Sequence, residues 1–303
     1  MEHELEEKNR SKKDGLSSES PVYSLDFPVF TSLEDYRFYK LLNADQASWR
    51  LEEERRLGEA MEPYSGYCVV CGTPVIFQGT WDYPCVIDGV KYPNFRETLE
   101  CVSCKLNSRK RSVVHVMKKL LAPDARIYMT EQVTPLYALV KNLYSGGVVG
   151  SEFLMDAVPP GQSKDGIRNE DVTSLTFEDA SFDAVCTCDV LEHVFDYRKA
   201  FLELARVLKS SGWLILSAPF LHHQDTEVRA RLGEDGSIEH LMPPEYHADP
   251  LSSEGCLCVY HFGWDILLEL KKAGFSWAGV VAYWSKEFGY MGLGEQIFII
   301  ARK

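Results

Sequence analysis

The sequence lacks two features that would place the protein in a membrane or on a nucleic acid. No window approaches the ~20 consecutive apolar residues of a membrane-spanning helix, and the N-terminus has no apolar core like that of a signal peptide. Basic residues are also outnumbered by acidic ones, so the formal net charge of the 303 residues is −13. Phosphate contacts dominate the affinity of a general nucleic-acid binder, so this charge argues against one. We therefore expect a soluble cytoplasmic protein with no membrane span.

Apolar residues are scarce at the N-terminus as well. Residues 1–20 consist largely of Glu, Lys and Ser, a composition that predicts a disordered tail. Residues 21–66 add apolar side chains and the sequence Thr31-Ser32-Leu33-Glu34, which matches the capping box of a helix start. We expect an N-terminal arm and helix in this region, packed on the core or in a homodimer.

Nine cysteines fit a reducing compartment, and four of them form two CxxC pairs. Cys68 and Cys71 make the first pair, and Cys101 and Cys104 make the second. Two such pairs favour a tetrahedral zinc site, although the gap is longer than usual and must hold a hairpin or loop. Because the protein fills all four positions, the zinc would be structural. The sequence thus predicts a zinc-binding element at residues 67–111; the alternative is four unrelated buried cysteines.

The segment that follows the second pair is basic and contains no acidic residue between positions 105 and 119. Apolar side chains recur within it at helical spacing, which predicts a helix with one apolar face. We favour a solvated basic face on this helix. The alternative is a docking surface for an anionic substrate such as a nucleotide-diphospho-sugar, with Arg109 and Arg111 as its centre.

Residues 171–220 predict a β-α-β unit. Residues 182–187 form a short apolar run of the kind found in a strand that is covered on both faces. Residues 200–208 repeat apolar side chains at helical spacing, and Gly212 ends the helical pattern before a second apolar run at residues 213–218. Such a unit requires a parallel sheet with helical crossovers.

The same stretch resembles the second half of a class I S-adenosylmethionine-dependent methyltransferase. The resemblance lies in the run from Asp171 to Asp183 and in Val190-Leu191-Glu192-His193-Val194. It extends over residues 112–303 and implies an α/β fold, a Rossmann-like doubly wound sheet of seven strands whose last strand is antiparallel. It also implies a methyltransferase that uses S-adenosyl-L-methionine as its cofactor.

The resemblance places donor-binding residues along one edge of that sheet. Residues 148–152 form an apolar strand ending in Glu152, whose carboxylate could accept hydrogen bonds from both ribose hydroxyls. An ordinary solvated glutamate is the alternative. The Asp171 carboxylate and the Val172 amide would face the adenine, and Asp189 would lie near the positively charged sulfonium.

Glycine is missing where the family usually has a glycine-rich first loop. After the strand expected at residues 125–130, the chain continues Glu131-Gln132-Val133-Thr134-Pro135. Thr134 is a candidate N-cap, because Pro135 suits the first turn of a helix. By resemblance, Glu131, Gln132 and Thr134 would contact the cofactor. A degenerate methyltransferase fold that has lost the cofactor is the alternative.

Residues 221–260 form an insertion that a minimal methyltransferase does not need. A loop of this length in a compact domain is commonly a functional lid, and its position after the fifth strand would place it above the methyl donor. A hydroxyl acceptor must lose its proton to a nearby base. His222 and His223 are the first candidates, His247 is the reserve, and Asp225 could orient the base. No HxxxH or comparable spacing supports a metal site in this insertion.

The cysteine pairs, the glycine-poor loop and the histidine-rich insertion together resemble a bacterial methyltransferase subgroup that accompanies glycosyltransferases. That resemblance implies O-methylation of a sugar or another small hydroxylated acceptor, with a carbohydrate or nucleotide-sugar as the partner molecule. Two alternatives belong to other classes. The zinc element could present RNA or protein to the methyltransferase core, or the chain could be a binding module without catalysis.

Overall fold

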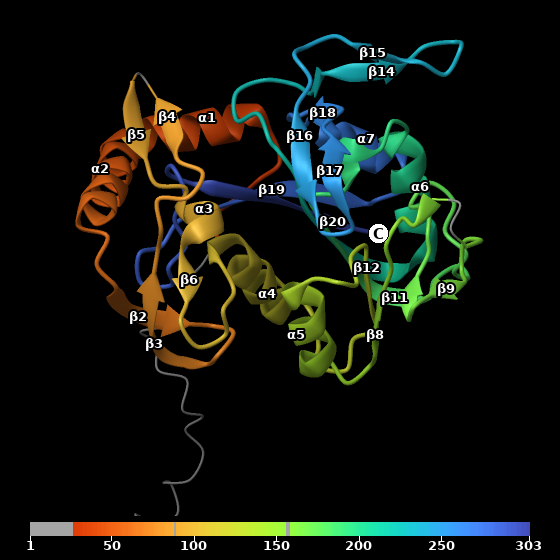
Figure 1. The fold of residues 1–303 in the computed structure, drawn as a ribbon, viewed down its shortest axis with the longest axis horizontal. Coiled ribbons are helices and arrows are strands. Elements are labelled where there is room, and N and C mark those ends of the chain that lie inside the picture. The colour runs from red at the N-terminus through yellow and green to blue at the C-terminus, as the bar shows by residue number, and fades with distance from the viewer. Residues whose placement is uncertain (1–26, 88, 156–157) are drawn as a thin grey trace, which may run out of the picture.

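A seven-stranded mixed sheet forms the centre of the computed structural model, which describes residues 27–87, 89–155 and 158–303 (Figure 1). The predicted tail at residues 1–20 lies outside the described residues. Across the sheet, the strands follow one another as β8 (Val148–Gly150), β7 (Ile127–Met129), β11 (Phe182–Cys188), β12 (Leu208–Ser217), β20 (Gln296–Arg302), β19 (Trp277–Tyr283) and β1 (Val29–Phe30).

Strand directions agree with the predicted fold class. β8, β7, β11 and β12 run parallel to one another. β20 lies between β12 and β19 and is antiparallel to both. The doubly wound α/β sheet with an antiparallel last strand is therefore confirmed.

Helices cover both faces of the sheet, and the side chains of its central strands alternate between two cores. Val185 and Leu214 pack with helices α6 and α7, whereas Cys186 and Ile215 pack with helices α4 and α5. This alternation is the period of two that a strand buried on both faces requires. The helices are α4 (Ser108–Leu120), α5 (Pro135–Leu143), α6 (Tyr197–Val207) and α7 (Ile266–Lys272).

The seventh strand comes from the N-terminal arm. β1 pairs antiparallel with β19, so that Val29 lies opposite Val281. Just before Asp171, the chain makes an isolated bridge between Glu152 and Asn169. The residues just before that bridge form a local hairpin of β9 (Ser163–Lys164) and β10 (Ile167–Arg168), which takes up their backbone hydrogen bonds.

Two helices follow the arm and pack on the core. Ser32 caps α1 (Leu33–Leu42) by accepting a hydrogen bond from the amide of Asp35, so the helix begins one residue later than the capping box Thr31–Glu34 predicts. Tyr36 of α1 is fully buried. α2 (Ala44–Ala60) buries Glu54, which accepts hydrogen bonds from Trp284 and from two backbone amides of the β19–β20 connection. The helix expected within residues 21–66 thus consists of two helices.

The four-cysteine element, residues 67–111, contains the hairpin that the long gap between the cysteine pairs requires. β2 (Tyr64–Cys68), β3 (Thr73–Gln78) and β6 (Glu100–Cys101) form a three-stranded sheet. Cys68 and Cys101 end two of these strands, and Cys71 and Cys104 lie in the turns that follow. Between the pairs, β4 (Cys85–Ile87) and β5 (Val90–Tyr92) form a hairpin, and α3 (Phe95–Thr98) follows.

The lid, residues 221–260, is built from short antiparallel pairs. β14 (Ala230–Leu232) pairs with β15 (Ile238–His240), and β16 (Tyr246–Asp249) pairs with β17 (Ser252–Leu257). β13 (Glu227–Val228) pairs with β18 (Tyr260–His261), which closes the base of the lid. Figure 1 shows these hairpins above the sheet, beside α7. Within the described ranges, no helix has the length and apolar character needed to cross a membrane.

Candidate functional site

The carboxyl ends of three parallel strands bring the predicted donor-site residues to one edge of the sheet. β7 ends at Met129, β8 at Gly150 and β11 at Cys188, and Met129 lies opposite Gly150 in the register. Glu131, Glu152 and Asp189 follow these strands closely. Ligands of open α/β sheets bind at this edge, so the three carboxylates lie where the resemblance places a cofactor.

Glu152 holds the glycine-poor loop. Its Oε1 atom accepts hydrogen bonds from the backbone amides of Gln132, at 2.6 Å, and Val133, at 2.9 Å. Burial raises the pKa of this carboxyl group, and the two amides oppose that rise. Glu152 is the residue predicted to bind the ribose, and one of its carboxylate oxygens therefore already accepts hydrogen bonds from the loop.

The loop fits against the sheet because the glycine stands on the neighbouring strand. A Cβ atom at Gly150 would lie 2.6 Å from the carbonyl oxygen of Glu131 and 2.5 Å from the Tyr137 ring. Thr134 caps α5 by accepting a hydrogen bond from the amide of Tyr137, as predicted. The Gln132 side chain binds the loop at residues 166–168. It donates a hydrogen bond to the Gly166 carbonyl oxygen and accepts one from the Arg168 amide.

Glu131 is the least satisfied member of this loop. Its Oε2 atom accepts a hydrogen bond from the Thr134 hydroxyl, but its buried Oε1 atom has no hydrogen-bond partner among the described residues. Burial raises the pKa of the Glu131 carboxyl group. A buried acceptor without a partner is costly, so this oxygen is suited to a cationic or hydrogen-bonding ligand.

The predicted adenine-binding pair lies in a turn after the Glu152–Asn169 bridge. Asp171 accepts hydrogen bonds from both the amide and the hydroxyl of Thr173, each at 2.8 Å. Val172 packs against the core on the α6 side of the sheet. The turn therefore fixes the backbone direction at these two residues.

Asp189 forms ion pairs with two arginines of the four-cysteine element. Its Oδ2 atom lies 2.7 Å from Arg109, and its Oδ1 atom lies 3.5 Å from Arg96 and accepts a hydrogen bond from Ser217 at 3.2 Å. Burial alone would raise the pKa of this carboxyl group, but Arg109 and Arg96 outweigh it and lower the pKa. Asp189 is thus a carboxylate at neutral pH.

These contacts correct the docking surface suggested for Arg109 and Arg111, whereas Lys105, Lys118 and Lys119 of the same basic segment are exposed, as a solvated face requires. Arg111 is fully buried and donates hydrogen bonds to the carbonyl oxygens of Leu99, Leu106 and Gly289. Arg109 is half-buried between Glu97 and Asp189. Neither arginine is open to an anionic substrate, because Arg111 is bound by backbone carbonyl oxygens and Arg109 by two carboxylates.

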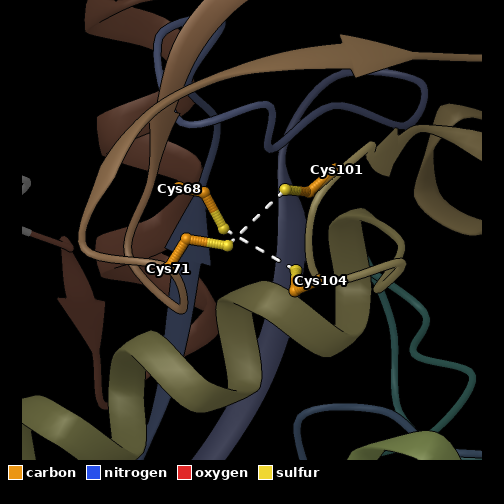
Figure 2. Close-up of side chains that lie close together, drawn as sticks. All are labelled: Cys68, Cys71, Cys101 and Cys104. Atoms are coloured by element: carbon orange, nitrogen blue, oxygen red, sulfur yellow. Dashed lines mark hydrogen bonds between the residues drawn. The ribbon is translucent and has the colours of Figure 1, made fainter.

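The four cysteines of the predicted zinc site converge (Figure 2). The Sγ atoms of Cys68 and Cys104 are 3.8 Å apart, as are those of Cys71 and Cys101. All four sulfur atoms lie within 4.8 Å of one another. A zinc tetrahedron with bonds of about 2.3 Å has edges of about 3.8 Å, so the four thiols have the chemistry and spacing that zinc requires.

Three of the predicted catalytic residues, His222, His223 and Asp225, lie at the start of the lid. His222 contacts the Tyr36 hydroxyl of α1 at 3.4 Å through Nδ1, and burial lowers its pKa to about 4. It lines a cavity of about 80 Å³ together with Lys40, Arg50 and Glu295. His223 and Asp225 are exposed. The structure therefore groups His222 with the N-terminal helices.

His247 lies with two residues that the sequence analysis did not select. Its Nδ1 atom is 3.6 Å from Glu192, and its ring meets the His193 ring edge-on, with centroids 5.0 Å apart. Cys258 and Glu192 raise the pKa of His247 to about 11, and His247 in turn lowers the pKa of Asp189. Glu192 and His193 belong to the motif that carries the resemblance, but their separation from His247 along the chain leaves no spacing signal.

Comparison with known proteins places the resemblance in the same part of the chain. Residues 148–216 match a family model described as a methyltransferase domain. Two curated Mycobacterium tuberculosis proteins, each named "Probable S-adenosylmethionine-dependent methyltransferase", are 32% identical over 87 residues. This match covers 29% of the chain and 30% of each relative. The chain therefore matches less than a third of the length of these relatives.

Solved methyltransferase structures also align with the chain. A Mesorhizobium loti S-adenosylmethionine-dependent methyltransferase aligns over 62% of this chain and 96% of its own, at 15% identity with a TM-score of 0.39. One from Methanosarcina mazei aligns over 62% and 96%, at 18% identity with a TM-score of 0.35. The match to the family model confirms the predicted methyltransferase class for residues 148–216.

Proposed function

We propose that this chain is an S-adenosylmethionine-dependent methyltransferase that methylates a hydroxyl group of a sugar or another small hydroxylated acceptor. The observation that carries the proposal is the gathering of Glu131, Glu152 and Asp189 at one sheet edge, within and beside the segment that matches a methyltransferase domain. Ligands of this fold class bind at that edge. The acceptor class rests on the resemblance described from the sequence.

The residues at this edge fit the methyl donor, which would supply a methyl group on a positively charged sulfonium. The unpartnered Oε1 atom of Glu131 offers an acceptor for a cationic amino group. Asp189 lies at the same edge, with its charge compensated by Arg109 and Arg96. We infer that the donor is held by Glu131, Gln132, Thr134, Glu152, Asp171, Val172 and Asp189.

Proton removal from the acceptor is assigned to a histidine of the lid. His247 is the best placed of the predicted candidates, because it lies beside Glu192 and close enough to Asp189 to affect its ionisation. Its raised pKa means that it must lose a proton before it can act as the base. His222 would have to leave its contact with Tyr36 to reach the same place. A histidine that acts as general base contributes about 10²- to 10⁴-fold to the rate.

The remaining parts of the chain support this site. We propose that the four cysteines bind a structural zinc ion, and that Arg96 and Arg109 connect this zinc-binding element, residues 67–111, to Asp189. Residues 21–66 form the arm and helices, and residues 112–303 form the methyltransferase domain with its lid.

Calorimetry with S-adenosylmethionine and S-adenosylhomocysteine tests the donor site. We expect both to bind, and Glu152→Gln to raise the dissociation constant about 10-fold or more, because it weakens hydrogen bonds to a charged group. The exposed Glu178 provides a matched control, since Glu178→Gln should leave the affinity unchanged. Failure of a folded wild-type protein to bind either compound would contradict the proposed function.

Methyl transfer from S-adenosylmethionine to a panel of nucleotide-hexoses tests the acceptor class and the base. His247→Ala should lower turnover about 10²-fold or more and leave donor affinity nearly unchanged, since a base acts on the reaction step. His240→Ala is the control, because His240 is exposed on the same lid. Full turnover in the His247 variant would show that the base lies elsewhere.

A further inference from the structure

A second group of candidate metal ligands lies apart from the four cysteines, where the lid meets the sheet edge. Glu192 and His193 come from the short 3₁₀ helix η4 (Leu191–His193), and His247 comes from β16. One oxygen of Glu192 and one ring nitrogen of each histidine all lie within 4.8 Å of one another. We call these three residues the histidine cluster. Two imidazoles and one carboxylate are ligands that divalent transition metals accept.

Glu192 provides independent evidence for a ligand in the histidine cluster. Its side chain has no exposed surface, and neither of its carboxylate oxygens has a hydrogen-bond partner within the described part of the chain. Oε1 lies 3.8 Å from Nε2 of His193 and 3.6 Å from Nδ1 of His247, which is beyond hydrogen-bonding distance. Ligands at about 2.1 Å from a tetrahedral ion stand about 3.4 Å apart, so both distances from Oε1 exceed the spacing around one ion by only a few tenths of an ångström.

The surrounding groups orient the two imidazoles as the outer partners of a metal site do. Nδ1 of His193 lies 2.8 Å from the carbonyl oxygen of Leu257, which can only accept, so the proton is on Nδ1 and the Nε2 lone pair faces the cluster. Nε2 of His247 lies 3.0 Å from Glu245, which leaves Nδ1 for the cluster. Glu245 is itself held by Arg229 and His261, each at 3.2 Å. Carboxylates and carbonyls in these positions raise ligand basicity.

We propose that Glu192, His193 and His247 bind a divalent transition-metal ion, with zinc as the best-suited ion, and leave at least one coordination position open. Three protein ligands with an open position are typical of a catalytic zinc site, in contrast to the four cysteines. Binding of the ion does not depend on the proposed function. Its consequence does: with an ion on Nδ1, His247 would no longer be the base, and an acceptor hydroxyl bound to the ion would lose its proton to water more readily.

A competing arrangement needs no ion, because protonated His247 could simply form an ion pair with Glu192. Metal stoichiometry separates the two. The full chain is prepared with the four-cysteine site filled by one equivalent of zinc, and is then titrated with zinc chloride in a calorimeter. We expect one further equivalent to bind to the wild-type protein, and Glu192→Gln and His193→Ala each to weaken this second equivalent at least 10-fold. Glu245→Gln should weaken it about 10- to 100-fold, as an outer partner does.

The controls test whether the four-cysteine site and the fold remain intact. His240→Ala and Cys258→Ser should bind both equivalents, and every variant should keep its first zinc and its thermal unfolding midpoint within a few degrees. Because Glu192 is buried, the less buried His193 variant serves if the Glu192 variant does not fold. The proposal is overturned if wild-type protein binds a single equivalent, or if Cys258→Ser removes the second equivalent while His193→Ala keeps it. Two equivalents without methyl transfer would refute the proposed function alone.

Discussion

The four-cysteine element and the histidine cluster are both groups of candidate metal ligands, but they are assembled over different distances along the chain. Each cysteine pair closes within one tight turn, and one hairpin separates the pairs. The histidine cluster joins η4 to the lid, so its geometry exists only when the lid is docked. A spacing motif therefore reveals the first group, whereas tertiary structure alone reveals the second.

The largest effect should come from breaking the local group. Cys101→Ser removes one of four thiolates, and a structural zinc contributes about 10 kcal/mol or more to the folding of isolated zinc-finger peptides. We expect the variant to lose its zinc and to unfold locally in β2, β3 and β6, as measured by metal analysis and hydrogen exchange. Cys85→Ser is the matched control, because Cys85 lies in the same element outside the group. Retention of zinc by the Cys101 variant would show that the thiols do not act together.

Asp189 is the residue that connects the two regions. Asp189→Asn leaves Arg109 half-buried with reduced charge compensation, and breaking a buried ion pair typically costs about 3–5 kcal/mol. We expect a loss toward the lower end of this range in denaturant unfolding, because Glu97 still pairs with Arg109. Asp179→Asn should cost less than about 1 kcal/mol, since its ion pair with Arg206 is at the surface. Equal losses in the two variants would contradict the connecting role of Asp189.

Acid sensitivity should distinguish His222 from the histidine cluster. Burial, His223 and Lys40 lower the pKa of His222 from 6.5 to about 4, and Glu295 opposes this. The unfolded chain therefore binds the proton more readily, so the stability contributed is complete above pH 6.5 and is lost as the pH falls toward 4. The loss is about 3 kcal/mol at most. His222→Gln should flatten the pH dependence of the unfolding free energy in this window, and the same change at exposed His240 is the control.

The smallest effect concerns the arm that completes the sheet. Ser32→Ala removes the side-chain cap of α1 and should cost about 1 kcal/mol in unfolding free energy. Thr31→Ala is the neighbouring control and should cost less, because the cap of α1 is the hydroxyl of Ser32. If Thr31→Ala cost as much as Ser32→Ala, Thr31 would contribute to the cap of α1 as much as Ser32 does.

Local sequence was sufficient for the parts of the fold that depend on local pattern. Apolar runs predicted β11 and β12, because strands buried on both faces need continuous apolar residues. The CxxC pairs predicted that four sulfur atoms would converge. The α5 cap at Thr134 also followed from neighbouring residues alone.

The parts that could not be predicted depend on partners far along the chain. Arg111 looked solvated because its acceptor Gly289 lies near the opposite end of the sequence. The histidine cluster was missed because Glu192 and His247 belong to different elements. β1 was missed as a strand because two residues carry too little pattern, and its partner β19 determines its conformation.

The pairing of β1 with β19 also determines when the structure can be completed. Val29 lies opposite Val281, and Glu295 receives Lys40 and Tyr39 from α1, so these contacts join the beginning of the described chain to its last strands. Contacts of such long sequence separation must overcome a large loop-closure entropy before they stabilise anything. During synthesis the arm has no partner strand until β19 has left the ribosome. Docking of the arm and of α1 is therefore a late folding event, and newly made chains carry an unpaired β19 edge until it occurs.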